Sequence, residues 1–361
     1  MSLPDLCQRY PRLQNAASSS TGDHKSFFDP KASLQGGGFI IYDDTFLDVL
    51  GVSPELEVIL ENQDYPFAHE AGIYIPSTDE YFFTSNIFIK NGMKCLSMTR
   101  AWRRDGKFNT EDIEIREMAM ANGGVNYRDG FIFCVMGDHS VKSALVYMEP
   151  RAPYQTTVLV DNYHGKPFNS VNDVVVHSDG SIWFTDPIYG AELGIRPRPE
   201  LPNQVYRFDP RSGDIRVVAD GLGRPNGICF APDEKTVYVT DTDAGHGDGT
   251  YDPLRPATIY AYDVIFRHGS PFLANKHLFA MADVGFPDGI KCDTAGNVYS
   301  GCGDGIHVWS PGGVLIGKIY LPDAQVGNFC FGPEGEMFIL NEHKVWRAKL
   351  GPNTRGALLK M

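Results

Sequence analysis

Six side chains that carry an oxygen atom recur along the chain, each just ahead of a short apolar run. They are Glu70, Asn122, Asn172, Asn226, Asp288 and Asn328. Two carboxylates with several neutral amide oxygens suit a hard divalent cation, since Ca²⁺ takes six to eight oxygen ligands in flexible geometry. If the fold brings these residues to one point, we expect one divalent cation there. Ca²⁺ is favoured, with Zn²⁺, Mn²⁺ and Mg²⁺ as alternatives.

The same residues have a purely structural interpretation. Asn226-Gly227 and Asp288-Gly289 are common turn dipeptides, and each of them alone is more typical of a turn than of a ligand. Six oxygen-bearing residues at one repeat phase, opening apolar runs instead of closing them, favour a shared site. No paired His or Cys accompanies them, which disfavours zinc.

The elements that must position these residues form a repeat. Each unit has an opening polar residue, an apolar run, a Pro-Asp-Gly-like turn and a second run rich in aromatic and β-branched residues, as in Asn172-DVVVHSDGS-IWFTD. The openers lie between 40 and 62 residues apart, close to the repeat of about 40–50 residues in propeller blades. A single blade cannot bury both faces of its sheet, so blades close into a ring. The sequence predicts an all-β, six-bladed β-propeller in preference to a β-sandwich.

One large domain accounts for the length of 361 residues. Residues 1–36 are mixed in composition and predict an N-terminal extension, and residues 37–361 predict the propeller. In a propeller the innermost strand of each blade lines the central channel, so the six openers should converge there. Closed sheet edges make a monomer plausible.

Charge and composition restrict the partners. The chain has 32 basic and 45 acidic residues, a net charge of −13, which repels phosphate backbones and anionic lipid surfaces. We therefore expect no nucleic-acid and no membrane partner. Seven cysteines without a CxxC pair, and the lack of a secretory leader or an apolar run of about 18 residues, predict a cytoplasmic protein with reduced thiols.

Common catalytic motifs are missing from the sequence. His69-Glu70-Ala-Gly-Ile lacks the second histidine of HExxH, and neither GxSxG nor GxxxxGK[ST] is present. The oxygen-bearing openers therefore remain the main candidates for chemistry.

Several ordered stretches resemble the gluconolactonase, regucalcin and luciferin-regenerating-enzyme family, especially its fungal lactonohydrolases. They are PFAHEAGIYIP, FNSVNDVVVHSDGSIWFTDPIYG, NQVYRFD, RPNGICFAPDEKTVYVTDTD, FPDGIKCD and GCGDGIHVWSPGGVLIGKIY. The resemblance runs from about Phe39 to near the end of the chain. It implies a six-bladed propeller with one divalent cation, usually Ca²⁺, held by Glu70, Asn172, Asn226 and Asp288. All four are among the six openers that the repeat had selected.

The resemblance implies hydrolysis of a small hydroxylated lactone, of the aldonolactone or pantoyl-lactone type. It assigns Asp288 as ligand and general base. We further expect Asn122, Asn172 and His69 to contact the substrate, although His69 also fits a hydrogen-bonded support. The loops 137–142 and 243–250 differ from those of the fungal proteins, and we expect them to shape the mouth of the site.

Two other functions stay open. The altered loops suit a biosynthetic enzyme that acts on a larger ring as a lactonase, cyclase or isomerase. The propeller could also be a non-catalytic binding scaffold, although such a scaffold has no need for acids and amides around one axis. A panel of lactones separates the first alternative from the aldonolactonase, and cation binding separates the second.

Overall fold

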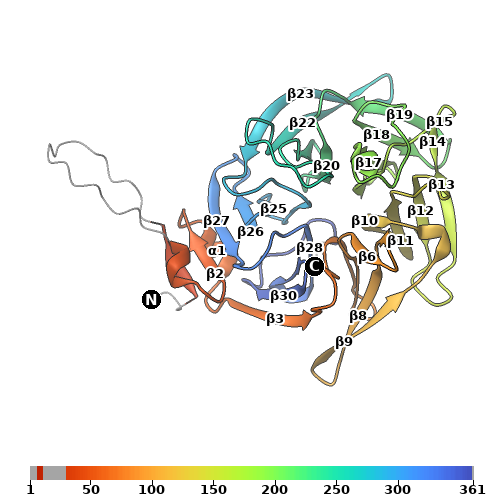
Figure 1. Ribbon diagram of the computed structural model, residues 1–361. Coiled ribbons are helices and arrows are strands. Elements are labelled where there is room, and N and C mark those ends of the chain that lie inside the picture. Colours follow the sequence, from red (N-terminus) through yellow and green to blue (C-terminus); the bar gives the residue numbers. More distant parts are fainter. Residues whose placement is uncertain (1–5, 11–29, 360–361) are drawn as a thin grey trace.

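Short β-strands joined by tight turns make up almost all of the chain. The computed structural model describes residues 6–10 and 30–359, and six sheets, antiparallel except for one parallel outer strand, surround a central channel (Figure 1). The predicted all-β, six-bladed β-propeller is confirmed. The expected extension at 1–36 lies mostly outside the described residues, which include 6–10 and 30–36 of it.

The first three blades are four-stranded and are numbered here from the innermost strand outward. Blade 1 contains β4 (Glu70–Ile75), β5 (Glu80–Thr84), β8 (Met98–Arg104) and β9 (Lys107–Ile113); blade 2 contains β10 (Ala121–Tyr127), β11 (Gly130–Val135), β12 (Ala144–Met148) and β13 (Thr156–Val160); blade 3 contains β16 (Val174–Val176), β17 (Ile182–Asp186), β18 (Gln204–Asp209) and β19 (Asp214–Ala219). Each blade follows the chain order from the channel to the rim.

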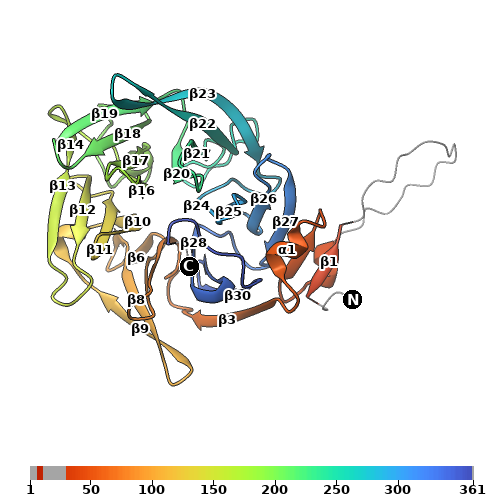
Figure 2. The same ribbon diagram turned by 180° about the vertical axis from the view of Figure 1, so that it is seen from behind.

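The other three blades complete the ring (Figure 2). Blade 4 contains β20 (Pro225–Phe230), β21 (Thr236–Asp241), β22 (Thr258–Arg267) and β23 (Ser270–Met281); blade 5 contains β24 (Ile290–Cys292), β25 (Val298–Cys302), β26 (Gly305–Trp309), β27 (Leu315–Tyr320), β2 (Gly38–Ile41) and β1 (Cys7–Arg9); blade 6 contains β28 (Asn328–Phe331), β29 (Glu336–Asn341), β30 (Lys344–Lys349) and β3 (Glu55–Glu61). Blades 5 and 6 therefore take their outer strands from the N-terminal part of the chain.

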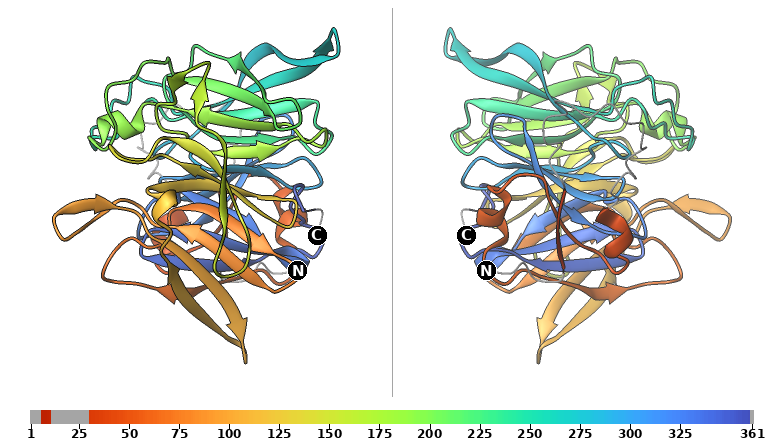
Figure 3. Two further views of the ribbon diagram at one scale, coloured as in Figure 1. Left: turned by 90° about the vertical axis from the view of Figure 1, so that its right-hand side faces the viewer. Right: turned by 90° about the vertical axis from the view of Figure 1, so that its left-hand side faces the viewer.

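Small elements decorate the blades. They are the hairpin β6 (Phe88–Lys90) and β7 (Met93–Cys95), the hairpin β14 (Asn162–Tyr163) and β15 (Lys166–Pro167), the short helices α1 (Phe46–Leu50) and α2 (Tyr189–Glu192), and the 3₁₀ turns Pro30–Ser33, Arg116–Met118 and Pro333–Gly335. Hairpins that extend beyond the body of the propeller are visible in side view (Figure 3).

The ring is closed by strands from the two ends of the chain. β3 pairs antiparallel with β30, with Val58 opposite Trp346, and so completes blade 6. β2 adds to the outer edge of blade 5, and β1 runs parallel to β2 beyond it. Because β3 covers β30, the outer edge of β30 is paired and cannot recruit a strand from another chain.

Apolar residues hold neighbouring blades together. Phe82 of β5 packs on Phe131 of β11 with ring centroids 4.9 Å apart, and both side chains are almost fully buried. The repeated turns have the predicted chemistry: Asp179 accepts from Ser181 N at 2.7 Å, and Gly180 has φ +86°. These contacts fix the register in which each blade presents its first residues to the channel.

The cysteines and the helices were both the subject of expectations from the sequence. All seven cysteines are free, and six of them are buried. Within residues 6–10 and 30–359, no helix has the length and apolar character needed to cross a membrane.

Candidate metal and active site

The openers of the repeat lie where the inner strands begin, at one end of the channel. In blades 1, 2 and 4 the pairing register shifts next to the opener, between Glu70 and Ile73, between Ala121 and Gly124, and between Pro225 and Ile228. Such β-bulges re-aim a side chain and are common beside functional sites. In blades 3 and 5 the opener comes two residues before the inner strand.

The glycine after an opener permits close packing of the next blade. A Cβ at Gly123 would clash with the carbonyl oxygen of Asn172, and a Cβ at Gly227 would clash with that of Asp288. Only glycine fits where another backbone approaches so closely. The Asn-Gly and Asp-Gly pairs therefore serve blade contact and are not hairpin turns, which resolves the alternative left open by the sequence.

Hydroxyl groups fix the backbone of the openers. Near the ends of the second strands, Thr84, Thr185 and Thr240 donate to the carbonyl oxygens of Asn122, Asn226 and Asp288 at 3.0, 2.6 and 2.9 Å. Each bond runs from one blade to the opener of the next. The opener side chains are therefore held at fixed positions around the channel.

Four of the opener oxygens are buried and have no hydrogen-bond partner in the described chain. They are Glu70 Oε1, Asn172 Oδ1, Asn226 Oδ1 and Asp288 Oδ1. A buried polar atom without a partner is costly and calls for an explanation. The four belong to the residues predicted as cation ligands, and all of these residues line one cavity. The donor set therefore fits a hard divalent cation.

The electrostatics of the site point the same way. Ligand atoms of His69, Glu70 and Asp288 lie within 4.8 Å of one another, an arrangement that could hold a metal ion. Burial and the nearby Glu70 carboxylate raise the pKa of Asp288 well above its usual range, although His69 opposes the shift. Two buried carboxylates this close require added positive charge to be ionised together, and a cation held between them would supply it.

His69 forms an ion pair in the wall of the cavity. Its Nδ1 lies 2.8 Å from Glu342 Oε1, and Asn86 Nδ2 donates to both oxygens of Glu342 at 3.1 Å. Burial lowers the pKa of His69, but Glu342, Asp288 and Glu70 outweigh burial and raise it to about 10. The imidazole is therefore charged at neutral pH.

The remaining two openers make other contacts. Asn122 lines the cavity, and its Nδ2 donates to the carbonyl oxygen of Asn172 at 3.3 Å. Asn328 is fully buried: its Nδ2 donates to Glu70 Oε2 at 2.8 Å and its Oδ1 accepts from Phe329 N at 2.8 Å. Asn328 therefore orients Glu70 and offers no free oxygen to a ligand, unlike the four openers with an unpaired oxygen.

The cavity has a volume of about 380 Å³ and includes residues that the sequence did not single out. The principal additions are Asn86, Leu96, Met136, Tyr189, Leu193 and Gln325. Most of them follow the second strand of a blade. Because that strand runs antiparallel to the first, its end returns to the level of the opener. Residues that follow the second strand of each predicted blade could therefore have been chosen from the sequence as candidates for the cavity lining.

The two loops expected at the mouth behave differently. Gly245 to Thr250 contributes several residues to the cavity wall. Asp138 instead uses its carboxylate within its own loop, where it accepts from Ser140 N and Val141 N at 2.6 and 2.8 Å.

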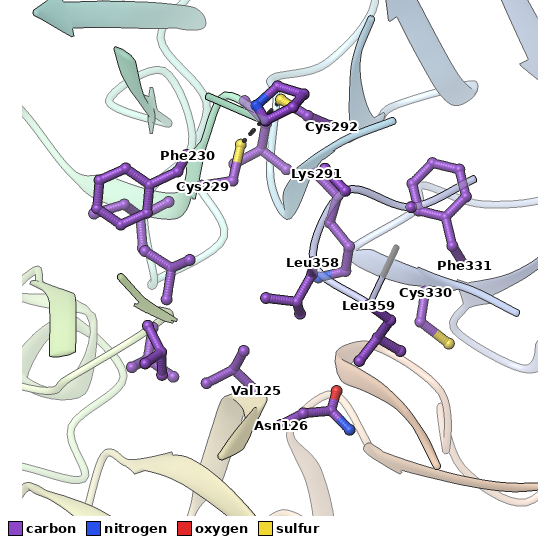
Figure 4. A pocket seen from close by; sticks show the side chains of 18 of the residues that line it. Val125, Asn126, Cys229, Phe230, Lys291, Cys292, Cys330, Phe331, Leu358 and Leu359 are labelled. Carbon is purple, nitrogen blue, oxygen red and sulfur yellow. Dashed lines mark hydrogen bonds between the residues drawn. The ribbon is translucent and has the colours of Figure 1, made fainter. Parts of the chain in front are cut away.

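A second cavity, of about 510 Å³, lies at the other end of the channel (Figure 4). Leu358 and Leu359 from the C-terminal segment cover it, and Cys229 Sγ and Cys292 Sγ face each other there at 3.7 Å. Its lining is mainly apolar and contains none of the four unpaired oxygens. The chemistry is therefore concentrated at the opener end.

Comparison with known proteins defines the class. Residues 97–341 match the SMP-30/Gluconolactonase/LRE-like region, so the chain belongs to this family. It is 30% identical over 343 residues to lactonohydrolase oryL of Aspergillus oryzae, covering 89% of this chain and 76% of that protein.

Solved structures agree with this assignment. A gluconolactonase from Xanthomonas campestris is 27% identical with a TM-score of 0.66, covering 86% of this chain and 94% of that one. Regucalcin from Agrobacterium tumefaciens, described as a calcium-binding protein, has a TM-score of 0.59 at 17% identity, covers 83% and 94%, and supports the fold alone. Homology to lactonohydrolases and gluconolactonases supports lactonase activity for this chain.

Proposed function

We propose that the protein is a divalent-cation-dependent lactonase that opens a hydroxylated lactone by attack of water on the ring carbonyl. The observation that carries the proposal is the set of four buried, unpaired oxygens in one cavity of a lactonase-family propeller. In the reaction, a bond forms between the water oxygen and the carbonyl carbon, the ring ester C–O bond breaks, and the released alkoxide takes up a proton. The product is a hydroxy acid.

Glu70, Asn172, Asn226 and Asp288 would hold the cation, and Ca²⁺ is favoured because all four donors are hard oxygens. The family also includes a calcium-binding regucalcin. When bound, such a cation polarises the ring carbonyl and stabilises the negative charge that develops on its oxygen.

The side chains of the chain supply the remaining steps. Asp288 accepts the proton of the attacking water, because its carboxylate would be ionised beside the cation and its buried Oδ1 has no hydrogen-bond donor. The amides of Asn122 and Asn172 orient oxygens of the substrate. His69, held charged by Glu342, faces the same cavity and contacts the substrate or supports the ligands.

Cation removal is the first test. Enzyme-dependent proton release from glucono-δ-lactone and pantoyl lactone, measured against a blank without enzyme, should stop when EDTA is added and return on addition of excess Ca²⁺. Mn²⁺, Mg²⁺ and Zn²⁺, added singly, rank the alternatives. Lactone hydrolysis that continues at the same rate in the presence of the chelator would contradict the cation-dependent mechanism.

Substitution of the two acids is the second test. We expect Asp288→Asn to lower kcat by at least about 100-fold, the lower range for general acid–base catalysis. Glu70→Gln should weaken Ca²⁺ binding in calorimetry and lose activity through that weakening. Asp214→Asn, on the exposed outer strand β19, is the matched control and should behave as the wild type. Full activity in either site variant contradicts the assignment.

A further inference from the structure

Two walls of the cavity above the four unpaired oxygens differ chemically, and the loop 245–251 with Tyr189 and Phe286 forms the rest of its lining. His69, Asn86 and Gln325 lie on one wall and are joined through Glu342. Ile87, Leu96, Met136 and Leu193 form the other. We refer to these four as the apolar wall. A substrate that fills the cavity therefore meets polar groups on one side and hydrocarbon on the other.

The apolar wall is part of a built cluster and not a set of isolated side chains. Its residues pack with Met120 and Ile195, which are 6% and 7% exposed, while Ile87, Leu96 and Leu193 are only partly buried and face the cavity. Within the apolar wall, Ile87 and Leu96 come from the β5–β8 connection of blade 1. Met136 directly follows β11 in blade 2, and Leu193 directly follows α2 in blade 3. Three blades thus contribute to one apolar surface outside the blade cores.

A contact across blades fixes this wall. Lys94, on the β6–β7 hairpin of blade 1, donates from Nζ to the carbonyl oxygen of Leu193 in blade 3 at 2.6 Å. The hairpin is an insertion between the second and third strands, and β6 lies near the centre of the ring in Figure 1. The insertion carries Ile87 and Leu96 at its two ends, so it places both against the cavity.

The chemistry of the two walls distinguishes between lactones. Ring hydroxyls placed against Leu96 and Leu193 would lose water without gaining a hydrogen-bond partner, which is unfavourable. A hydrocarbon substituent placed there gains from burial in proportion to its area. Ligand sites combine a mostly apolar lining with a few positioned polar groups. In this cavity the apolar lining lies on the apolar wall, and the positioned polar groups lie opposite the hydrocarbon.

We propose that the preferred substrates are lactones whose ring carries an unbranched alkyl substituent. The ring carbonyl lies over the four unpaired oxygens, and the alkyl chain runs along the apolar wall. This inference rests on the proposed lactonase reaction, and it replaces the hydroxylated lactone with an alkyl-substituted one as the preferred substrate.

A homologous series tests the inference in the wild-type protein. Hydrolysis of γ-valerolactone, γ-heptalactone and γ-nonalactone is measured by proton release with saturating Ca²⁺, beside glucono-δ-lactone. We expect kcat/KM to rise about fourfold per added methylene, the order of magnitude for burial of hydrocarbon. The γ-nonalactone value should exceed that for glucono-δ-lactone.

Variants of the apolar wall connect the preference to its residues. Leu96→Asn and Leu193→Asn should each flatten the dependence on chain length, whereas Leu193→Met should retain it. Val52→Asn is the control, because Val52 is 81% exposed and does not line the cavity. Thermal melts identify any variant that fails to fold, and the conservative Leu193→Met then carries the comparison together with the wild-type series.

The outcomes separate the two proposals. Efficient, EDTA-sensitive hydrolysis of glucono-δ-lactone with no dependence on alkyl length overturns the alkyl preference and leaves the lactonase proposal standing. No hydrolysis of any lactone with added cation overturns both. A steep series that stays unchanged in both asparagine variants shows that the apolar wall does not select the chain, and overturns the assignment of the residues.

Discussion

The openers of the repeat share a residue class but divide into two roles. Asn172 and Asn226 each leave a carboxamide oxygen unpaired in the channel, whereas Asn328 uses both polar ends of its carboxamide within the protein. The contact from Asn328 Nδ2 to Glu70 Oε2 fixes the rotamer of a proposed ligand and leaves Oε1 free. A side chain that orients a ligand in this way affects metal affinity without touching the metal.

We therefore predict that Asn328→Ala weakens Ca²⁺ affinity by about 10- to 100-fold, the range found when a group that orients a metal ligand is removed. Activity should recover at high Ca²⁺, because the four ligands are intact. Calorimetry and the Ca²⁺ dependence of lactone hydrolysis measure the effect. Asn109→Ala, on an exposed part of β9, is the control. A loss of activity that saturating Ca²⁺ does not restore would show that Asn328 acts in some other way.

At the scale of the element, blade 5 contains a buried charged network away from the site. Lys318 Nζ of β27 donates to Asp304 Oδ2 at 3.2 Å and to Asp283 Oδ1 at 2.6 Å, and its side chain is almost fully buried. Burial raises the pKa of Asp304, but His307, Lys318 and Lys31 outweigh burial and hold it well below its usual range. The stability that Asp304 contributes is therefore present above the unfolded-state pKa of about 4 and is lost as the pH falls below it.

We predict that Lys318→Met lowers the free energy of unfolding by about 3–5 kcal/mol at pH 7, the cost of removing one partner from a buried ion pair. The difference from the wild type should narrow as the pH is lowered towards 3, because protonation of Asp304 removes the carboxylate charge that Lys318 partly offsets beside Lys31 and His307. Urea unfolding at several pH values measures it. Lys235→Met, at an exposed turn, should change stability by less than about 0.5 kcal/mol. A pH-independent difference would contradict this electrostatic explanation.

At the scale of the whole molecule, closure of the ring depends on the N-terminal part of the chain. β3 pairs with β30 along Glu55–Glu61, and without it the outer edge of blade 6 is open. The openers of blades 6 and 1, Asn328 and Glu70, touch across this closure. The integrity of the site and the closure of the ring are therefore coupled.

We predict that a chain starting at Gln63, which lacks β1, β2 and β3, loses its cooperative thermal transition and aggregates through the exposed edge of β30. A chain starting at Gly37, which lacks only β1 among the described strands, should melt cooperatively. Circular dichroism and size-exclusion chromatography distinguish the two. Cooperative melting of the shorter chain as a monomer would show that β3 is dispensable for closure.

The local pattern of the sequence determined the class of fold and the identity of the proposed ligands. Six units with polar openers at regular intervals imply six blades, and equivalent repeat positions meet at the axis by symmetry. The six openers could therefore be chosen without coordinates, and the resemblance to the lactonase family selected Glu70, Asn172, Asn226 and Asp288 among them. The turn chemistry around Asp179 was also predictable, because it depends only on neighbouring residues.

The tertiary structure decided what each of those residues does and what surrounds them. Only the packing shows that the side chain of Asn328 donates a hydrogen bond to Glu70. It also shows that Glu342 pairs with His69 across 273 positions of sequence. Leu96 and Leu193, likewise distant in sequence, lie in one apolar wall. These contacts join loops of different blades, whose lengths and paths follow no repeat. Periodicity encodes what every blade has in common, whereas the selectivity of the cavity arises where the blades differ.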